Sequence, residues 1–528
     1  MTAERPTFSI LTPVYDPPPG ALRDMIASVR EQSFTAWELI LVDDRSPDGR
    51  VRDALRAAAA TDSRIVVVER EANGGIVAAS DDALARARGD FVVLIDHDDL
   101  IEPHALESVA EVLDQNADVD YLYTDEDKID DEGRRYDTFR KPDWSPERLR
   151  SQMYTSHLSV LRTSLVREVG GFREGFEGSQ DHDLALRVTE RARRVHHLPE
   201  VLYHWRAHPA STASEYQAKP YAWLAGQRAV QEHCDRVGIT AEVELGPLPG
   251  TYRLQRRVGP GHRVSVVIPT NGSSGMVWGE WRAFVVECVR SFLQDPGDVT
   301  VEVVIVYDEG TPPAVLTELK ELAGKNLVLV PFVGPFNFSK KCNEGYLAST
   351  GDVVAFLNDD LQIVSDRFLE RLVAPLAEPD VGMTGARLLF ADGTLQHGGH
   401  RYSRGDITHT HFGADASWGG HFSELVISRE CSGVTAAAAA VRREVFEEVG
   451  GFCEALPANF NDVDLSRKVG RSGYRMVWLP DATAYHFESR TRIPTVHDWE
   501  YRLITTRWDF AADDRFMPTG PDLASAAN

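Results

Sequence analysis

Strand-like and helix-like patterns alternate along the first part of the chain. Residues 8–14 and 37–42 are mostly apolar runs of strand length, and polar turn residues follow each of them. Between them, Leu22, Met25 and Val29 recur at the spacing of one helical face. Apolar strands that alternate with amphipathic helices predict a mostly parallel sheet covered by helices on both faces.

The same order of patterns occurs twice in the chain. The run at 8–16 has a counterpart at 264–272, and the run at 87–100 has one at 349–361. Because several further segments recur in the same order, we predict two tandem Rossmann-like α/β domains, each with a mostly parallel sheet. The predicted parts are an N-terminal domain at 1–212, a structured connector at 213–262, a C-terminal domain at 263–492 and a tail at 493–528.

Composition narrows the class of protein. The 528 residues carry a net charge of -25, which disfavours nucleic acid as a partner because binding to phosphates needs Lys and Arg. The five cysteines form no CxxC pair, which predicts a reducing, cytoplasmic environment without disulfides. We find neither a signal peptide nor an apolar run approaching the ~20 residues that span a bilayer, so any membrane association is expected to be peripheral.

Acidic residues follow the predicted strands. Asp96 and Asp98 stand directly after an apolar run, and Asn358 and Asp360 stand at the same place in the second repeat. Ligands of open α/β sheets bind beyond the carboxyl ends of the strands. Two carboxylates separated by one residue can bind one Mg²⁺ or Mn²⁺, and a histidine suits Mn²⁺ as a further ligand.

Several longer stretches carry a resemblance to a known family. "QDHDLALRV" at 180–188, "LPEVLYHWR" at 198–206 and "FNDVDLSRKVGRSGYRMVWLPDATAYHFESRTR" at 460–492 resemble family-2 glycosyltransferases with the GT-A fold. The resemblance covers nearly the whole chain, twice over. The stretches look like those of bacterial enzymes that build O-antigen, rhamnan and related surface polysaccharides, and the resemblance implies two tandem GT-A domains.

The resemblance implies a role for particular residues in each repeat. Those expected to bind the nucleotide sugar are Pro13, Val14, Tyr15, Asp43, Asp44, Asp96, Pro269, Thr270, Asp308 and Asn358. Those expected to hold Mn²⁺ or Mg²⁺ are Asp98 and His204 in the first repeat and Asp360 and His486 in the second. The residues expected to act as catalytic base are Asp181 and Asp462.

The implied reaction is an inverting, metal-dependent sugar transfer from a UDP-, dTDP- or GDP-sugar to a growing, lipid-linked glycan. One alternative is that the N-terminal module alone is catalytic and that the C-terminal module binds glycan or nucleotide. Tyr307, which stands where Asp43 would align, and Asn358 favour that alternative, whereas Asp360 and His486 oppose it. A sugar nucleotidyltransferase is a further alternative, although the loops after the first strand of each repeat contain no Lys or Arg.

Structural explanations compete with some of these roles. Asp181 and Asp183 could cap or charge the first turn of a helix, and a single histidine is often structural. The H-x2-H and H-x-H spacings formed by four histidines of one Gly-rich stretch could hold zinc. These histidines are His397, His400, His409 and His411. Since the stretch resembles a loop and has no cysteine nearby, we favour a loop on the acceptor side of the site.

Overall fold

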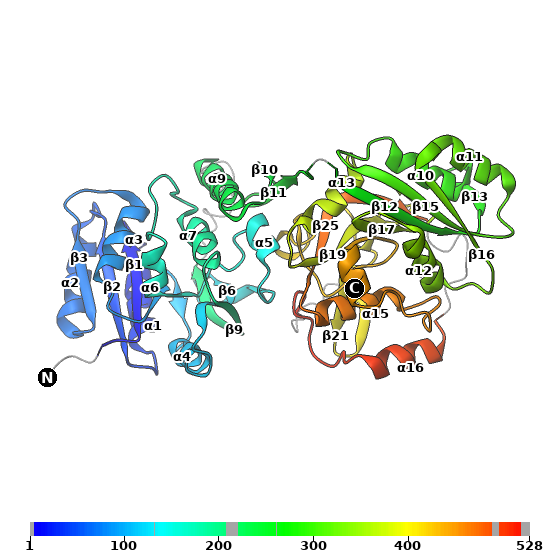
Figure 1. Cartoon of the computed structure of the whole chain (residues 1–528). Coiled ribbons are helices and arrows are strands. Elements are labelled where there is room, and N and C mark those ends of the chain that lie inside the picture. The colour runs from blue at the N-terminus through cyan, green and yellow to red at the C-terminus, as the bar shows by residue number, and fades with distance from the viewer. Residues whose placement is uncertain are drawn as a thin grey trace. The chain divides into compact units, whose positions relative to one another are not determined.

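The chain forms two compact units, each built around one large sheet (Figure 1). The computed structural model describes residues 5–18, 20–130, 132–206, 220–259, 261–487 and 496–518. Of the predicted parts, the start of the connector, the end of the C-terminal domain and much of the tail lie outside the described residues, at 213–219, 488–492, 493–495 and 519–528. The prediction of two consecutive α/β domains is confirmed.

The first unit comprises the described residues up to Trp144, together with 152–238 and 243–252. Its sheet has nine strands in the order β3-β2-β1-β4-β8-β6-β9-β5, and β7 pairs with β6. The strands are β1 (Phe8–Val14), β2 (Trp37–Asp43), β3 (Ile65–Glu69), β4 (Phe91–Leu94), β5 (Leu100–Ile101), β6 (Val119–Ile129), β7 (Arg135–Phe139), β8 (Ser159–Arg162) and β9 (Arg194–Arg206).

Helices cover this sheet because the apolar side chains of its strands alternate between two faces. Phe8 and Ile10 of β1 share a core with Met25 and Val29, as the helical spacing predicted. The helices of the unit are α1 (Ala21–Arg30), α2 (Gly49–Thr61), α3 (Gly75–Arg86), α4 (Ala105–Gln115), α6 (Thr163–Glu168), α7 (Gln180–Thr189) and α9 (Pro220–Val237).

The second unit comprises residues 145–151, 239–242 and the described chain from Arg253 onward. Its sheet has ten strands, ordered β16-β15-β12-β17-β24-β19-β25-β18, while β20 pairs with β19 and β23 with β25. The strands are β12 (Arg263–Thr270), β15 (Thr300–Asp308), β16 (Leu327–Phe332), β17 (Val353–Leu357), β18 (Leu361–Ile363), β19 (Val381–Leu389), β20 (Leu395–His397), β23 (Arg429–Glu430), β24 (Ala438–Arg442) and β25 (Arg475–His486).

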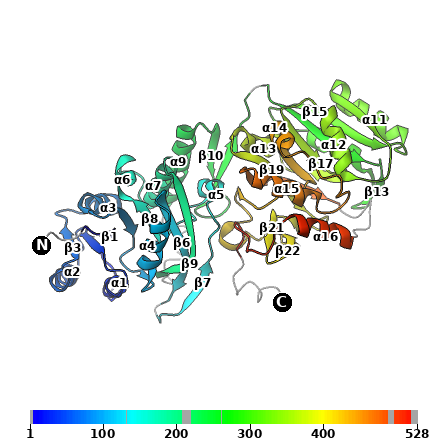
Figure 2. The same cartoon turned by 60° about the horizontal axis from the view of Figure 1, so that its bottom comes forward.

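Two apolar cores flank the second sheet. Val266 and Ile268 of β12 pack with α10 and α11 on one face, whereas Val267 packs with α12, α14 and α15 on the other (Figures 1 and 2). The helices are α10 (Phe284–Leu293), α11 (Pro313–Ala323), α12 (Phe338–Ala348), α13 (Phe368–Val373), α14 (Arg443–Glu448), α15 (Asn461–Arg471) and α16 (Asp498–Arg507). Two-stranded sheets are formed by β10 (Ala241–Leu245) with β11 (Tyr252–Arg256), β13 (Ser274–Val277) with β14 (Glu280–Ala283), and β21 (His400–Ser403) with β22 (Asp406–His409).

The short helix α5 (Pro146–Ser151) belongs to the second unit although its sequence lies in the first repeat. Its buried Glu147 pairs with Arg256 at 2.7 Å, and Arg150 pairs with Glu378 at 2.7 Å. Sequence patterns did not predict that α5 belongs to the second unit, because the ion pairs that hold it join segments more than one hundred residues apart.

Candidate active site

One cavity in the second unit gathers the polar side chains that follow β12, β15 and β17. Its volume is about 740 Å³. Because β12 pairs in parallel with both β15 and β17, their carboxyl ends meet at one edge of the sheet, where ligands of such sheets bind. The lining includes every site residue predicted for the second repeat, namely Pro269, Thr270, Asp308, Asn358, Asp360, Asp462 and His486.

The predicted metal ligands Asp360 and His486 are in contact in this cavity. Asp360 Oδ1 lies 3.2 Å from His486 Nε2. The Nδ1–H of His486 donates to Gln396 Oε1 at 2.6 Å, so Nε2 keeps its lone pair and accepts from the Asn358 amide at 3.0 Å. Metal-binding histidines donate their other ring N–H in this way. A carboxylate, an imidazole nitrogen and an amide oxygen, which rotation of the Asn358 side chain would supply, fit Mn²⁺ or Mg²⁺.

A buried lysine stands beside the strand-end acids of the cavity. Lys341 Nζ lies 2.8 Å from Asp308 Oδ1 and donates to the Thr270 carbonyl at 3.2 Å. The Thr270 hydroxyl donates to Asp359 Oδ2 at 2.6 Å. Burial, together with the charge of Asp360, raises the pKa of Asp359 to about 7. The cavity therefore holds a fixed cation and an additional carboxyl group, and neither Lys341 nor Asp359 was predicted from the sequence.

Asp462 lies in the first turn of α15, in the wall of the same cavity. Its Oδ1 accepts from the Val463 amide at 2.9 Å, and its Oδ2 lies 3.8 Å from His400 Nε2. Asp464, two residues on, is fully buried and pairs with Lys468 at 3.0 Å. The structural role considered for Asp181 and Asp183 in the first repeat thus fits Asp464 here, whereas Asp462 faces the cavity.

Apart from Asp96, which follows β4, the predicted nucleotide-binding residues of the first unit lie at the ends of β1 and β2. Pro13 and Val14 are the last residues of β1, and Tyr15 beyond them is half exposed. Asp43 is buried and accepts from the Ser46 amide at 3.0 Å. The sequence therefore located these positions correctly relative to the strands.

Asp44 is enclosed by hydrogen-bond donors. Arg70 Nη1 lies 2.5 Å from its Oδ1, and the amides of Gly74 and Gly75 donate to its two oxygens at 2.9 and 2.7 Å. These contacts tie β2 to the start of α3. In the second unit the corresponding Asp308 is half-buried, faces the cavity and has a lysine partner.

A histidine just before β8, which the sequence did not single out, lies beside the acid loop that follows β4. His157, Asp96 and Asp99 each offer a ligand atom within 4.8 Å of the others. Burial disfavours protonation of His157, but Glu126, Asp96 and Asp99 outweigh it and raise the His157 pKa to about 9. Burial and the nearby Asp96 raise the Asp99 pKa to about 8. A protonated histidine thus lies among these carboxyl groups.

The acid loops of the two repeats differ in length by one residue. The late histidine of each repeat pairs with a leucine just after the loop, Leu100 in the first and Leu361 in the second. The preceding residues, Asp99 and Asp360, therefore occupy equivalent positions in the strand register. Alignment of the strand-end motifs along the sequence, residues 96–98 with 358–360, instead matches Asp98 with Asp360. The role of Asp98 as a metal ligand stays a prediction. Asp99, at the register position of Asp360, is fully buried and accepts from the Tyr203 hydroxyl and the Arg206 amide.

His204 has different partners from its counterpart His486. Its Nδ1 lies 2.6 Å from Asp127 Oδ1, and its Nε2 lies 3.4 Å from Glu102 Oε1. Both ring nitrogens are thus directed at carboxylates other than Asp98. In the first unit, the structure brings the histidine together with acids that the sequence did not assign to the site.

Asp181 lies at the start of α7 and accepts from the His182 amide at 2.8 Å. Burial raises its pKa, and the His182 amide and the charge of His157 oppose that rise. Asp183 is instead fully buried between Arg173 and Arg187, the latter at 2.6 Å. As in the second unit, the first acid of the helix lies near the site and the second is held in ion pairs.

Comparison with known proteins identifies the family. The sequence model described as "Glycosyl transferase family 2" matches residues 9–170 and 265–450, which is more than half of the chain. The chain belongs to glycosyl transferase family 2. The two matched segments fall in the two repeats, so this family-2 chain contains the family domain twice.

Relatives of this family-2 chain include longer proteins. It is 41% identical over 494 residues to the uncharacterized protein y4gI of Sinorhizobium fredii, a match covering 92% of the chain and 54% of y4gI. It is 35% identical over 508 residues to the O-antigen biosynthesis protein RfbC of Myxococcus xanthus, covering 94% of the chain and 39% of RfbC. The chain thus spans about half, or less, of the length of these relatives. S. aureus TarS 1-349 in complex with UDP-GlcNAc matches with a TM-score of 0.36 and 21% identity, covering 43% of this chain and 66% of that one.

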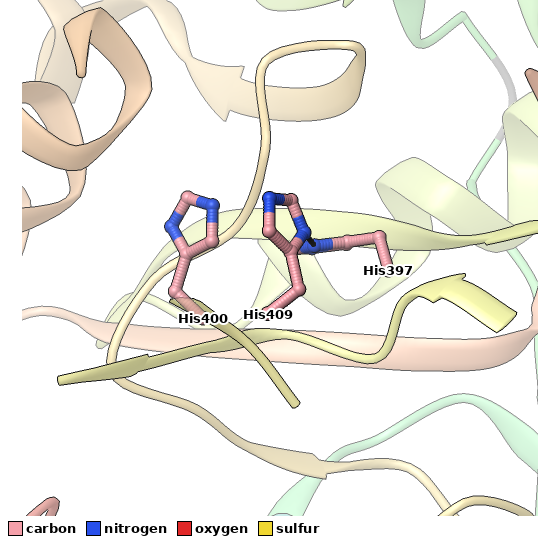
Figure 3. Close-up of side chains that lie close together, drawn as sticks. All are labelled: His397, His400 and His409. Atoms are coloured by element: carbon pink, nitrogen blue, oxygen red, sulfur yellow. Dashed lines mark hydrogen bonds between the residues drawn. The ribbon is translucent and has the colours of Figure 1, made fainter. Parts of the chain in front are cut away.

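The histidines of the Gly-rich stretch do not all meet. Nδ1 of His397 lies 2.7 Å from Nδ1 of His409, and His400 lies beside them (Figure 3). His411 instead bonds to Glu424 at 2.5 Å. His400 and His409 line the cavity of this family-2 module together with residues of β22. The two interpretations considered for this stretch, a zinc site and a loop beside the active site, therefore concern the same cavity.

Among the described residues of this family-2 chain, no helix is both long and apolar enough to cross a membrane.

Proposed function

We propose that the C-terminal module transfers a sugar from a nucleotide-sugar donor to a hydroxyl group of a growing glycan, with inversion at the anomeric carbon. The observation that carries this proposal is the single cavity that contains all the site residues predicted for the second repeat. The relative RfbC, described as an O-antigen biosynthesis protein, supports a cell-surface polysaccharide as the product. A lipid-linked acceptor and a cytoplasmic, peripherally membrane-associated protein complete this proposal.

In this mechanism Asp462 is the catalytic base. Its Oδ1 is fixed by the Val463 amide and its Oδ2 accepts a long bond of 3.4 Å from the Ala436 amide. The carboxylate oxygen Oδ2 keeps a further lone pair with which to accept the proton of the attacking hydroxyl. Inversion in one displacement requires the base and the departing diphosphate to lie on opposite sides of the anomeric carbon. Asp308, with Lys341 and the end of β12, would bind the nucleotide.

Asp360 and His486, with Asn358, would hold Mn²⁺ or Mg²⁺, whose chemical contribution when bound is to neutralise the charge that develops on the diphosphate. Gln396 fixes the ring of His486 so that Nε2 faces the ligand position. Asp360 contributes the negative charge that a divalent ion requires.

The N-terminal module is proposed to carry a second transfer site built on Asp98, Asp181 and His204. Its geometry supports this less strongly, because the acid that faces His204 Nε2 is Glu102 and because Asp44 is enclosed by donors. A candidate alternative is therefore one catalytic module, and the contacts favour the C-terminal module for that role.

The test is an assay of nucleotide sugars (dTDP-rhamnose, UDP-galactose, UDP-N-acetylhexosamines and GDP-mannose) with the full chain and Mn²⁺. We expect release of the nucleoside diphosphate with at least one donor and loss of that release in EDTA. Release of pyrophosphate would instead support a sugar nucleotidyltransferase. Full activity in EDTA would remove the metal from the proposal.

A further inference from the structure

Three buried or half-buried histidines lie on consecutive short strands in the second unit. His397 ends β20, His400 begins β21 and His409 ends β22 (Figure 3). The ring centroids of His397 and His409 are 4.8 Å apart, and those of His400 and His409 are 5.0 Å apart. Such a cluster could bind a metal ion or serve as hydrogen-bonding groups, and the hydrogen bonds distinguish the two.

A backbone amide determines where the protons of two of these rings lie. The Thr435 N–H donates to His397 Nε2 at 3.2 Å, so Nε2 of the neutral ring carries the lone pair and Nδ1 carries the proton. The Nδ1–H of His397 then donates to Nδ1 of His409 at 2.7 Å. The proton of His409 is consequently on Nε2. Burial and neighbouring positive charges keep both rings neutral by lowering the His397 pKa well below its usual value and that of His409 to about 3.

These proton positions disfavour a metal ion in the cluster. A histidine ligand needs a lone pair directed at the metal and usually donates its other N–H to an acceptor. In His397 the ring nitrogen away from the cluster accepts from Thr435, and the nitrogen directed into the cluster carries the proton. Metal binding by His397 Nδ1 would therefore require an imidazolate or the loss of the Thr435 hydrogen bond.

His409 Nε2–H is instead a fixed donor in the lining of the cavity. It has no hydrogen-bond partner among the residues that the structure describes. His400 bonds through Nδ1 to the Tyr402 hydroxyl at 2.9 Å and presents Nε2 to Asp462 at 3.8 Å. With Tyr402 as donor to Nδ1, His400 Nε2 carries a proton directed at Asp462 and is not an acceptor for His409. An oxygen of a bound ligand would supply the missing acceptor.

The position of His409 indicates which part of the ligand supplies this acceptor oxygen. It lines the same cavity as Asp462 and His486, and the negative charge of Asp462 acts on its ring. In the proposed function, Asp462 lies at the attacking hydroxyl and His486 at the diphosphate. The sugar undergoing transfer lies between these two groups.

We propose that His409 Nε2–H donates a hydrogen bond to a hydroxyl or carbonyl oxygen of the transferred sugar and thereby helps to select the donor. The inference rests on the proposed function of the C-terminal module. His397 and Thr435 act as positioning groups, because they fix the proton on the nitrogen of His409 that faces the cavity. Phe412 and Ile407 in the same lining provide apolar surface for the C–H faces of a sugar ring.

The test compares each nucleotide sugar with its own nucleoside diphosphate, using isothermal titration of the full chain with Mn²⁺. For the donor that the wild type prefers, we expect the sugar to improve the affinity relative to the free diphosphate. The dissociation constant of the free diphosphate divided by that of the nucleotide sugar should fall about three- to tenfold in His409→Phe, because phenylalanine has no N–H to donate. His409→Gln retains an N–H donor, so it should keep most of the preference and serves as the matched control.

An unchanged ratio in His409→Phe would overturn this inference, whereas absence of any nucleotide binding to the wild type would overturn the proposed function itself. A second measurement does not depend on a substrate. Long-range ¹H–¹⁵N correlation of histidine-labelled chain should place the protons on His397 Nδ1 and His409 Nε2 at pH 7.5, and adding Zn²⁺ alone should leave both signals in place. Binding of Zn²⁺ that moves both signals and is lost in His397→Phe would overturn the assignment in favour of a metal site.

Discussion

The sheets of the two modules have the same strand order, and acidic residues follow corresponding strands in each. The modules differ in the contacts of the late histidine, His204 or His486. In the C-terminal module, Gln396 accepts one N–H of His486 and leaves the other nitrogen facing Asp360. In the N-terminal module, His204 lies between Asp127 and Glu102. Both rings use Nδ1 to bond an acceptor, an amide oxygen in the C-terminal module and a carboxylate in the N-terminal one, so the difference lies at Nε2. That nitrogen faces Asp360 and Asn358 in the C-terminal module and Glu102, at 3.4 Å, in the N-terminal module. The contacts of this histidine therefore distinguish the two modules, although their sequence motifs are alike.

The same contrast holds at the nucleotide end of the site. Arg70 and two backbone amides surround Asp44, whereas Asp308 has Lys341 and faces a cavity. A carboxylate whose oxygens are already engaged stabilises the fold, and one that borders a cavity can also bind a ligand. These differences support the C-terminal module as the stronger candidate for catalysis.

The largest expected effect comes from removing the proposed bases one at a time. Asp462→Asn should lower nucleoside diphosphate release by about 10²–10⁴-fold, because the amide cannot accept the proton of the attacking hydroxyl. Asp181→Asn is the matched change in the other module and should leave the C-terminal activity intact. Initial rates with the preferred donor measure both. If Asp181→Asn alone abolished transfer, the C-terminal module would be a binding partner and the comparison would be reversed.

The group behind each histidine offers a second, smaller test. Gln396→Leu removes the acceptor that orients His486, so the Mn²⁺ concentration giving half-maximal activity should rise about 10–100-fold. Asp127→Asn alters the corresponding partner of His204 and should leave that Mn²⁺ dependence in place. A Gln396→Leu protein with the wild-type Mn²⁺ response would show that His486 does not bind the ion.

Much of the fold and of the C-terminal site was predictable from sequence because the signals are local, whereas the contrast between the modules was not. Apolar runs and the polar residues after them are read along a few residues, so the sheets and the positions of Asp360 and Asp462 were predicted. His486 was found because its strand recurs in both repeats. Gln396, Lys341 and His157 were not, because segments distant in sequence bring them to the site and the repeats do not share them. The extra residue in the acid loop of the first repeat was also not predicted. The sequence motifs align Asp98 with Asp360, whereas the strand register aligns Asp99 with Asp360.

Changes to the basic partners of Asp44 and Asp308 should separate stability from binding. Arg70→Met leaves a nearly buried carboxylate with only backbone donors, so the free energy of unfolding of the first unit should fall by about 1–3 kcal/mol. Lys341→Met should destabilise less, because Asp308 is one-third exposed and can be hydrated, but it should weaken nucleoside diphosphate binding. Chemical denaturation followed by titration measures both quantities. Equal losses of stability in the two variants would contradict the distinction between the two carboxylates.

The smallest effect concerns pH and His157 in the first unit. The folded chain keeps His157 protonated up to about pH 9, whereas the unfolded chain releases that proton near pH 6.5. Its contribution to stability is therefore complete below pH 6.5 and is lost as the pH rises through 9. The raised pKa of Asp99, about 8, acts in the same direction, since the folded carboxyl group holds its proton longer than the unfolded one. Between pH 6.5 and 9 the wild type should lose on the order of 1 kcal/mol more stability than His157→Gln. Denaturation curves across that range measure the difference. Parallel pH profiles for the two proteins would mean that the carboxyl groups around His157 do not hold its proton.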